Sequence, residues 1–178
     1  MEGSAAFDER VGETLMKQIW APWRLQYILE GNPEGCIFCV KPTEDKDREN
    51  LILFRGKHIF IIMNLFPYNN GHLMIVPYQH AEDLSGLPED VLCELMTFTK
   101  KSTTILKQVF STQGFNIGIN LGKAAGAGID EHLHIHIVPR WMGDTNFMPV
   151  LADLKVMPQH IWATYDLLLP FFREIRED

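Results

Sequence analysis

The sequence predicts an α+β fold in which an antiparallel sheet of about five strands is packed on one side by a long helix and a C-terminal helix. Two observations predict this class. Short apolar runs, rich in isoleucine, alternate with turn-forming residues, which is typical of antiparallel strands. One longer segment, up to about residue 110, repeats its apolar side chains near the helical period.

The strands are expected at residues 51–54, 58–64, 73–77, 114–121 and 133–138. The turn cluster FPYNNG separates the second strand from the third, so these two strands should pair as an antiparallel meander. The polar stretch KPTEDKDREN, residues 41–50, is expected to be a loop. A sheet of this kind needs helices to cover its apolar face.

Two helices are expected to supply that cover. The first begins at Pro88, because proline suits a first turn, and the acidic Glu89 and Asp90 favour the positive end of the helix dipole. It should run to about Phe110. The second helix is expected at residues 158–176, where Pro170 should break or kink it.

Size and composition predict one domain with a real core, because 46% of the 178 residues are hydrophobic and only 22% are charged. We expect a mobile tail at residues 1–15 and a single domain at residues 16–178. No apolar run approaches the roughly 20 residues that span a bilayer, and the N-terminus lacks the order of a secretory signal. We therefore expect a cytoplasmic protein that binds no membrane. A net charge of −7 argues against broad nucleic-acid binding.

The most informative stretch is HLHIHIV, residues 132–138. A strand alternates its faces, so His132, His134 and His136 should share one face while the interleaved apolar residues enter the core. Alternate residues on a strand lie roughly 6.5–7 Å apart. Near neutral pH these imidazoles can act as nucleophiles, acids or metal ligands.

Three alternatives to a catalytic role have to be weighed for this stretch. A purification tag would lie at a terminus and would not interleave apolar residues, and a histidine-rich edge strand needs no chemistry at all. A metal site is the stronger rival, but three successive residues on one strand face span a line too long for one ion to touch all three. The pattern therefore favours catalysis.

The same residues resemble the signature of the histidine triad family, which is His, apolar, His, apolar, His, apolar, apolar. The resemblance covers roughly residues 35–145. Within the family, the chain is most similar to the fragile-histidine-triad branch and to bacterial diadenosine tetraphosphate phosphorylases, the latter especially at residues 19–24 and 141–147. Matching positions outside the triad are Asn64, Gly71-His72, Asn120-Leu121-Gly122, Gly126 and Val138-Pro139-Arg140.

The resemblance implies a role for each histidine. His134 would attack the α-phosphorus and form a nucleotidyl-histidine intermediate, which an acceptor then resolves. His136 would contact the phosphate and support the leaving oxygen, and His132 would orient its neighbours. His72, on the adjacent strand, would complete the network, although a hydrogen-bonded core histidine is the alternative.

The resemblance also implies positions that hold the nucleotide. A side-chain amide can bond the ribose hydroxyls, and small residues let backbone N–H groups approach phosphate. Apolar side chains would enclose the base. These positions are Asn64 for the ribose; Asn120, Gly126, Ala127 and Gly128 for phosphate; and Phe38, Ile62 and Leu65 for the base.

Each assignment has a simpler alternative. Asn64 can cap the turn that follows its strand, and the apolar residues can be plain core. Ala127 and Gly128 also depart from the family, because many triad hydrolases carry Gln, Ser or Thr just before the first histidine. Trp20 or Trp23 could stack on a second base, or could only pin the N-terminal segment to the domain.

Cys36 and Cys39 have the two-residue spacing of half a zinc site. In one set of triad proteins, the resemblance implies, such a pair joins the histidines at the positions of His80 and His132. The four would form a closed, structural zinc site; two reduced thiols and a surface histidine are the alternative. Cys93 is expected only to pack, and no organic cofactor is expected.

The sequence therefore predicts a nucleotidyltransferase acting on dinucleoside polyphosphates, with adenine nucleotides as substrates. The first choice is a diadenosine tetraphosphate phosphorylase that uses inorganic phosphate and yields ATP and ADP, with Lys123, Arg140 and Lys155 as candidate cations for the acceptor. The alternatives are a hydrolase using water, a nucleoside phosphoramidase, a nucleotide-binding signalling module and a zinc-dependent interaction protein. The resemblance implies a homodimer with a continuous sheet.

Overall fold

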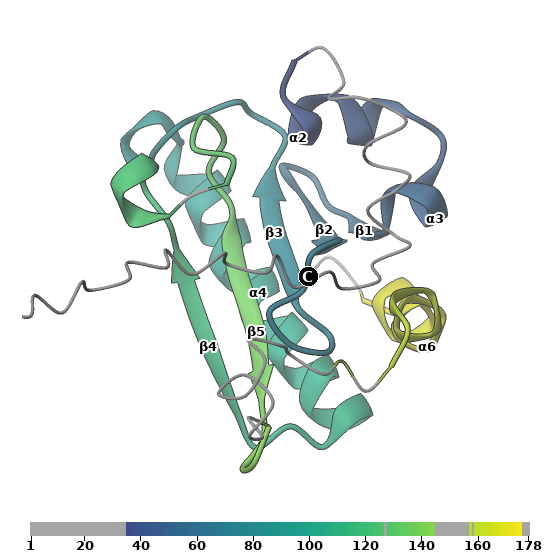
Figure 1. Cartoon of the computed structure of the whole chain (residues 1–178). Coiled ribbons are helices and arrows are strands. Elements are labelled where there is room, and N and C mark those ends of the chain that lie inside the picture. Colours follow the sequence, from purple (N-terminus) through teal and green to yellow (C-terminus); the bar gives the residue numbers. More distant parts are fainter. Residues whose placement is uncertain (1–34, 127, 145–156, 158, 176–178) are drawn as a thin grey trace, which may run out of the picture. The chain divides into compact units, whose positions relative to one another are not determined.

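A computed structural model describes residues 35–126, 128–144, 157 and 159–175 (Figure 1). The chain divides into two compact units, Met1–Glu34 and Gly35–Asp178. The expected tail at residues 1–15 and both Trp20 and Trp23 belong to the first unit and lie outside the described residues. The sheet, its helices and all candidate histidines belong to the second unit.

The second unit is built on the five-stranded antiparallel sheet that the sequence predicts. In the sheet the strands follow the order β1-β2-β3-β5-β4, and each neighbouring pair is antiparallel. The strand that ends the histidine stretch therefore lies inside the sheet, beside the strand that follows His72. The strands are β1 (Ile52–Arg55), β2 (Ile59–Met63), β3 (Leu73–Pro77), β4 (Gly114–Ile119) and β5 (Ile135–Arg140).

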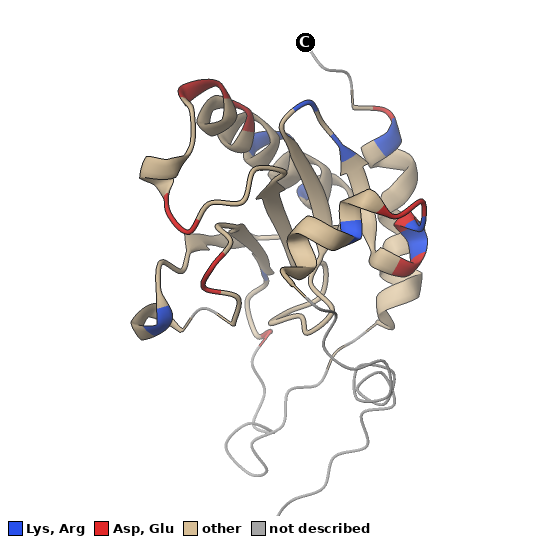
Figure 2. Ribbon diagram, turned by 90° about the horizontal axis from the view of Figure 1, so that it is seen from above, with Lys and Arg blue, Asp and Glu red and all other residues tan. Residues whose placement is uncertain are grey.

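The centre of the sheet is covered on both faces. Every residue of β2 and β3 is buried, which explains why these strands read as continuous apolar runs rather than alternating ones. Helix α4 (Glu89–Phe110) packs on β2, β3 and β5. Charged residues colour the helices and connecting loops far more than the central strands (Figure 2). Strand β4, at the edge of the sheet, has no fully buried residue.

The prediction of a polar loop at residues 41–50 is wrong. The segment contains two short helical turns, η1 (Lys41–Thr43) and α3 (Asp47–Asn50). They follow a third short helix, α2 (Ile37–Val40). Arg55 of β1 holds them to the sheet by donating to the Pro42 carbonyl at 2.6 Å and to the Asp47 carboxylate at 2.7 Å. Helices of three or four residues are too short to show a periodic pattern, and tertiary contacts form them.

The two longer helices match the sequence better. Helix α4 begins directly after Pro88 and ends where Ser111 adopts a left-handed backbone conformation. Helix α6 (Ile161–Arg173) packs on β1 and α4, and the Tyr165 hydroxyl donates to the Ile52 carbonyl at 2.9 Å. Of the expected break or kink at Pro170, the break is wrong, because the helix continues past Pro170 to Arg173. Pro170 lies on the exposed face, where water can satisfy the carbonyl that a proline leaves without a partner.

Candidate active site and metal centre

Four histidines form a buried cluster at the ends of β3 and β5. His72 and His132 are fully buried, and His136, the most exposed of the four, is only 9% exposed. The rings of His134 and His136 lie 4.6 Å apart, and those of His72 and His136 lie 5.1 Å apart. Buried imidazoles need hydrogen-bond partners, and those partners decide which ring nitrogen carries the proton.

The ring of His134 is fixed in one tautomer. Its Nδ1 lies 2.8 Å from the His132 carbonyl oxygen, which can only accept, so Nδ1 carries the proton. Nε2 is therefore left with a free lone pair. Burial lowers the pKa of His134, although the same hydrogen bond opposes that shift. The ring is neutral near pH 7, as a nitrogen nucleophile must be.

The ring of His136 is fixed in the opposite sense by a relay that begins at the backbone. The Tyr68 N–H donates to Nδ1 of His72 at 3.0 Å, so His72 carries its proton on Nε2. That Nε2–H donates to Nδ1 of His136 at 3.0 Å. His136 must then carry its own proton on Nε2. Burial, followed by the neighbouring His134, lowers the pKa of His136 to about 4.

The cluster thus places a nitrogen lone pair beside an N–H donor. A lone pair on His134 can attack an electrophilic atom, and the N–H of His136 can stabilise negative charge on an oxygen that leaves it. The backbone fixes both states, directly through the His132 carbonyl for His134 and by way of His72 for His136. The arrangement suits displacement at phosphorus without a metal ion at the reacting atoms.

Only His136 lies in β5, which corrects the expected placement of all three histidines on one strand. β5 begins at Ile135, so His132 and His134 precede it. The register between β3 and β5 would pair Leu133 with Pro77, which has no N–H to donate, and the Leu133 N–H bonds the Ala81 carbonyl at 2.7 Å instead. The ladder therefore stops, and His132 turns toward the two cysteines.

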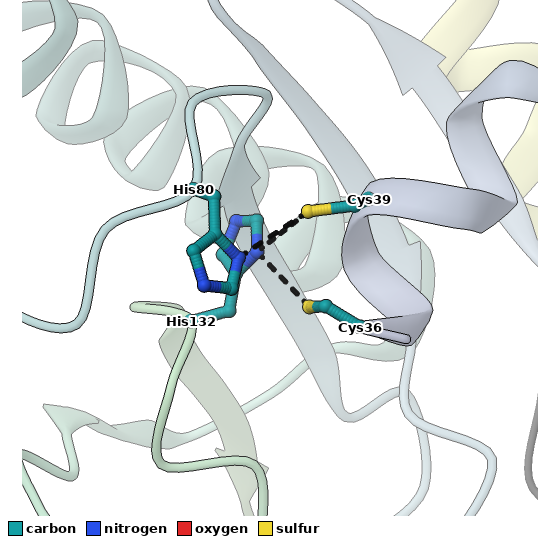
Figure 3. Close-up of side chains that lie close together, drawn as sticks. All are labelled: Cys36, Cys39, His80 and His132. Atoms are coloured by element: carbon teal, nitrogen blue, oxygen red, sulfur yellow. Dashed lines mark hydrogen bonds between the residues drawn. The ribbon is translucent and has the colours of Figure 1, made fainter. Parts of the chain in front are cut away.

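The predicted metal ligands are together in the structure. Cys36, Cys39, His80 and His132 each offer one ligand atom, and the four atoms lie within 4.8 Å of one another. Sγ of Cys36 lies 3.2 Å from Nδ1 of His132, and Sγ of Cys39 lies 3.3 Å from Nδ1 of His80. Figure 3 shows both sulfurs pointing toward the two imidazoles, from α2 on one side and from loops of the sheet on the other.

The donor set fits a tetrahedral zinc ion. With Zn–S and Zn–N bonds of the usual lengths, ligand atoms lie roughly 3.3–3.8 Å apart, and three of the sulfur–nitrogen distances here are 3.2, 3.3 and 3.6 Å. The Nε2–H of His132 donates to the Pro77 carbonyl at 2.9 Å, which leaves Nδ1 free to bind a metal and supports the ring from behind. Burial, and then Cys36, raise the pKa of the Cys39 thiol, a shift that a bound cation would reverse.

The predicted nucleotide-binding residues lie in two different settings. The Asn64 Oδ1 accepts from the Phe66 N–H at 2.9 Å, which is the turn-capping alternative, while its Nδ2 lies 3.3 Å from Nδ1 of His72. Phe38 and Ile62 are fully buried, and Leu65 is half-buried. In this structure Phe38 and Ile62 are core residues, which is the alternative to a role in binding the base.

The glycine-rich loop before the triad is open. Asn120 is half-buried, Gly128 is exposed, and Ala127 lies outside the described residues. Gly122 and Gly126 have φ angles of 74° and 79°, where a side chain would strain the backbone. The glycines thus set the shape of a loop that a ligand can approach.

The candidate cations are mostly engaged. Arg140 donates through Nε and Nη2 to the Asp144 carboxylate, at 2.6 and 2.9 Å, and through Nη1 to the Asn116 amide oxygen. Lys123 is 87% exposed and lies 3.7 Å from Asp130. Lys155 is outside the described residues. None of the described cations is therefore committed to the triad.

Sequence reasoning missed three residues that support His72. The Tyr68 ring packs against His72 at 4.7 Å and against His136 at 5.8 Å. The amide of Asn69 donates to the Pro139 carbonyl and to Asp144, and the Asn70 amide oxygen accepts from the Thr164 hydroxyl. The signal was present in the turn cluster, where two consecutive asparagines precede Gly71. Polar side chains in a turn usually face water, so the residue pattern alone does not predict their burial.

Comparison with known proteins agrees with this geometry. The chain is 39% identical over 176 residues to the AP-4-A phosphorylase of Mycobacterium tuberculosis, which covers 94% of this chain and 90% of that protein. It is 33% identical over 93 residues to the asymmetrical bis(5'-nucleosyl)-tetraphosphatase of Schizosaccharomyces pombe, covering 52% of this chain and 50% of that enzyme.

A solved structure has the same fold. The zinc-bound histidine triad family protein from Mycobacterium smegmatis superposes with a TM-score of 0.64 at 24% identity, over 79% of this chain and 94% of that one. The HIT domain matches residues 45–142, which include β1 to β5 and all four clustered histidines. The chain belongs to the histidine triad, or HIT-domain, family.

Proposed function

We propose that the protein is a nucleotidyltransferase that acts on dinucleoside polyphosphates through a nucleotide covalently bound to His134. The observation that carries this proposal is the pair of fixed tautomers, with a lone pair on Nε2 of His134 and a proton on Nε2 of His136. The two rings are adjacent, so one phosphoryl group can meet both.

Two displacements would make one turnover. In the first, Nε2 of His134 bonds the α-phosphorus, the bond from phosphorus to the bridging oxygen breaks, and the leaving polyphosphate oxygen accepts the hydrogen bond from His136. In the second, an acceptor oxygen bonds the phosphorus, the bond from phosphorus to nitrogen breaks, and His134 regains its lone pair. Splitting one displacement into two lowers each barrier.

We propose diadenosine tetraphosphate as substrate and inorganic phosphate as acceptor, giving ATP and ADP. The M. tuberculosis relative, described as an AP-4-A phosphorylase, supports this choice because the alignment covers nearly the whole of both chains. The open loop at Gly126 and Gly128 can present backbone N–H groups to an anion. Asn64 and Asn120 are the proposed ribose and phosphate contacts.

The hydrolase is the second candidate, and particular observations favour it. The side chain of Arg140 is held by Asp144 and Asn116, and Lys123 is exposed beside Asp130, so neither is set aside for a phosphate acceptor. The S. pombe relative is a tetraphosphatase. Water as acceptor needs no cation.

Product analysis separates these two candidates. The full chain is incubated with diadenosine tetraphosphate at phosphate concentrations from zero to several millimolar, and nucleotides are resolved by ion exchange. We expect ATP plus ADP at a rate that rises with phosphate. ATP plus AMP at a rate indifferent to phosphate would replace the phosphorylase with the hydrolase.

We also propose a structural zinc ion held by Cys36, Cys39, His80 and His132. Four protein ligands leave no open position, so the ion would supply stability and order rather than Lewis-acid chemistry. The proximity of the four ligand atoms and the hydrogen bond behind His132 support this proposal.

Two proposals concern the setting of the protein. We propose a homodimer that extends the sheet across the edge strand β4, and its support is the exposure of that strand, where Ile117 is 47% exposed. We propose a cytoplasmic location, which suits a reduced thiol pair. Among the described residues, no helix has the length and apolar character needed to span a bilayer.

A further inference from the structure

One peptide unit connects the cysteine–histidine cluster to the proposed nucleophile. The carbonyl of His132 accepts from Nδ1–H of His134, and the N–H of the same peptide unit, that of Leu133, donates to the Ala81 carbonyl at 2.7 Å. A peptide unit is planar and stiff, so holding its N–H holds its carbonyl. Ala81 directly follows His80, and His132 is itself in the cluster. Two of the four ligands therefore border the peptide that sets the tautomer of His134.

The side chain of Phe38 makes a second connection. Phe38 lies between Cys36 and Cys39 in α2 and is fully buried. Its ring centroid lies 5.0 Å from that of His134 and 5.5 Å from that of His132. Aromatic contacts at this range fix ring orientation as well as burying area. The short helix that begins after Cys36 and contains Cys39 thus also carries the aromatic ring that contacts His134.

We propose that the cluster of Cys36, Cys39, His80 and His132 is a positioning device for the nucleophile, with Phe38 as the positioning residue that transmits it. The inference deepens the proposed function and rests on the role of His134 in it. An isolated α2 of four residues has no stability of its own. The contacts of its cysteines with the two histidines hold it in place, and with them the Phe38 ring.

If the proposal is right, the tautomer of His134 depends on whether the four ligands are held together. A metal site that only stabilised the fold would not change that tautomer. When the ligands are held together, the 132–133 peptide and the Phe38 ring give His134 one orientation and a proton on Nδ1. When they separate, both supports loosen, and the His134 ring can rotate or carry its proton on Nε2. That second tautomer has its lone pair on Nδ1, so Nε2 can no longer attack phosphorus.

The tautomer can be measured without turnover. The full chain is labelled with ¹⁵N-histidine, and long-range proton–nitrogen correlation spectra are recorded with zinc and after chelation, with His134→Gln identifying the signals of residue 134. We expect a single Nδ1–H state with zinc and a mixture after chelation, restored by adding zinc. An unchanged Nδ1–H state in a chelated chain that is still folded would overturn the proposal.

Because chelation can unfold the chain, a matched pair of variants decides the matter independently. Phe38→Leu removes the ring that contacts His134, whereas Phe60→Leu removes an equally buried ring that contacts Phe38 and Tyr78 but not the triad. Both are expected to bind Co²⁺ with the same thiolate absorption as wild type. We expect Phe38→Leu to slow the single-turnover formation of the nucleotidyl enzyme by about tenfold at unchanged KM, and Phe60→Leu to change it by less than about twofold.

Equal slowing by both variants would show that only stability was lost, and would overturn the positioning role of Phe38. The NMR result stands apart from catalysis. A wild-type chain that shows the zinc-dependent tautomer but never forms a nucleotidyl enzyme would refute the proposed function and leave the positioning intact. If the folded chain forms the nucleotidyl enzyme equally fast with and without zinc, the proposed function is supported and the positioning role of the cluster is refuted.

Discussion

At the scale of single residues, the site depends on which nitrogen of each imidazole carries a proton. Histidines spaced two apart predict only that three rings lie close together. The tautomers come from backbone groups that no spacing reveals, the His132 carbonyl for His134 and the Tyr68 N–H for His72. Substitution of one ring should therefore affect chemistry far more than folding.

Replacing His134 by alanine is expected to lower kcat by roughly a thousandfold or more, because no other described lone pair is fixed in its place. The fold should survive, since the ring contributes to the site rather than to the apolar core. Steady-state turnover and far-UV circular dichroism measure the two effects. His58→Ala, which removes a half-buried histidine beside Asp90 of α4, is the control. A His134→Ala enzyme that keeps a tenth of its activity would rule out the nucleophile.

The pH dependence follows from the pKa of His136, which burial and His134 lower to about 4. An ordinary unfolded histidine has a pKa near 6.5, so between these values protons bind the unfolded state in preference to the folded one. Stability should therefore fall as the pH drops from about 6.5 to 4, by about 1.4 kcal/mol per unit for this group. Urea unfolding at pH 7.5 and 5.0 measures the loss, which should shrink in His136→Gln. An equal loss in wild type and variant would mean that His136 is not the group responsible.

At the scale of secondary-structure elements, the sequence predicted all five strands to within about two residues at each end, because apolar runs and turn clusters mark them clearly. It missed α2 and α3, whose few residues carry no period, and it misplaced the start of β5. That start depends on Pro77, 58 positions earlier in the sequence than Ile135, whose missing N–H ends the ladder. Pairings between distant residues of this kind are not encoded locally.

The metal cluster is an element-scale feature because it joins α2 to two loops of the sheet. We expect one zinc ion per chain in protein prepared without a histidine tag, measured by elemental analysis. Cys36→Ser should lower the melting temperature, because a metal that binds only the folded chain stabilises it. Cys93→Ser, an exposed thiol on α4, is the matched control and should leave both zinc and melting unchanged. Zinc-free protein from zinc-replete medium would contradict the assignment.

At the scale of the whole molecule, one edge of the sheet, at β1, is covered by helices, and the other edge, at β4, is exposed. α6 and the short helices pack beside β1, whereas β4 ends the sheet with exposed residues (Figure 1). The resemblance in the triad predicted the family and the metal ligands, and the structure brings those ligands together. The roles of the nucleotide-binding residues stay predictions, because they depend on contacts with a bound nucleotide.

The open edge leads to a test of assembly. Ile117→Lys places a charge in the middle of β4 and should convert the proposed dimer into a monomer, because charges on an edge oppose strand pairing. Light scattering coupled to size exclusion measures the mass, and Met96→Lys, an exposed apolar residue on α4, is the control. Wild-type protein that is already a monomer, or a variant that stays dimeric, would place the interface elsewhere or remove it.

The hydrogen bond from the Tyr68 backbone to His72 has a consequence for the path of the catalytic proton. A proton that reached His136 could pass inward only by shifting through His72, yet Nδ1 of His72 is occupied by an amide hydrogen that the backbone does not release. The relay therefore orients but does not conduct. Any proton that His136 gains in one half-reaction must therefore leave from its Nε2 side in the other. The two half-reactions then exchange protons with substrate and product rather than with the protein interior.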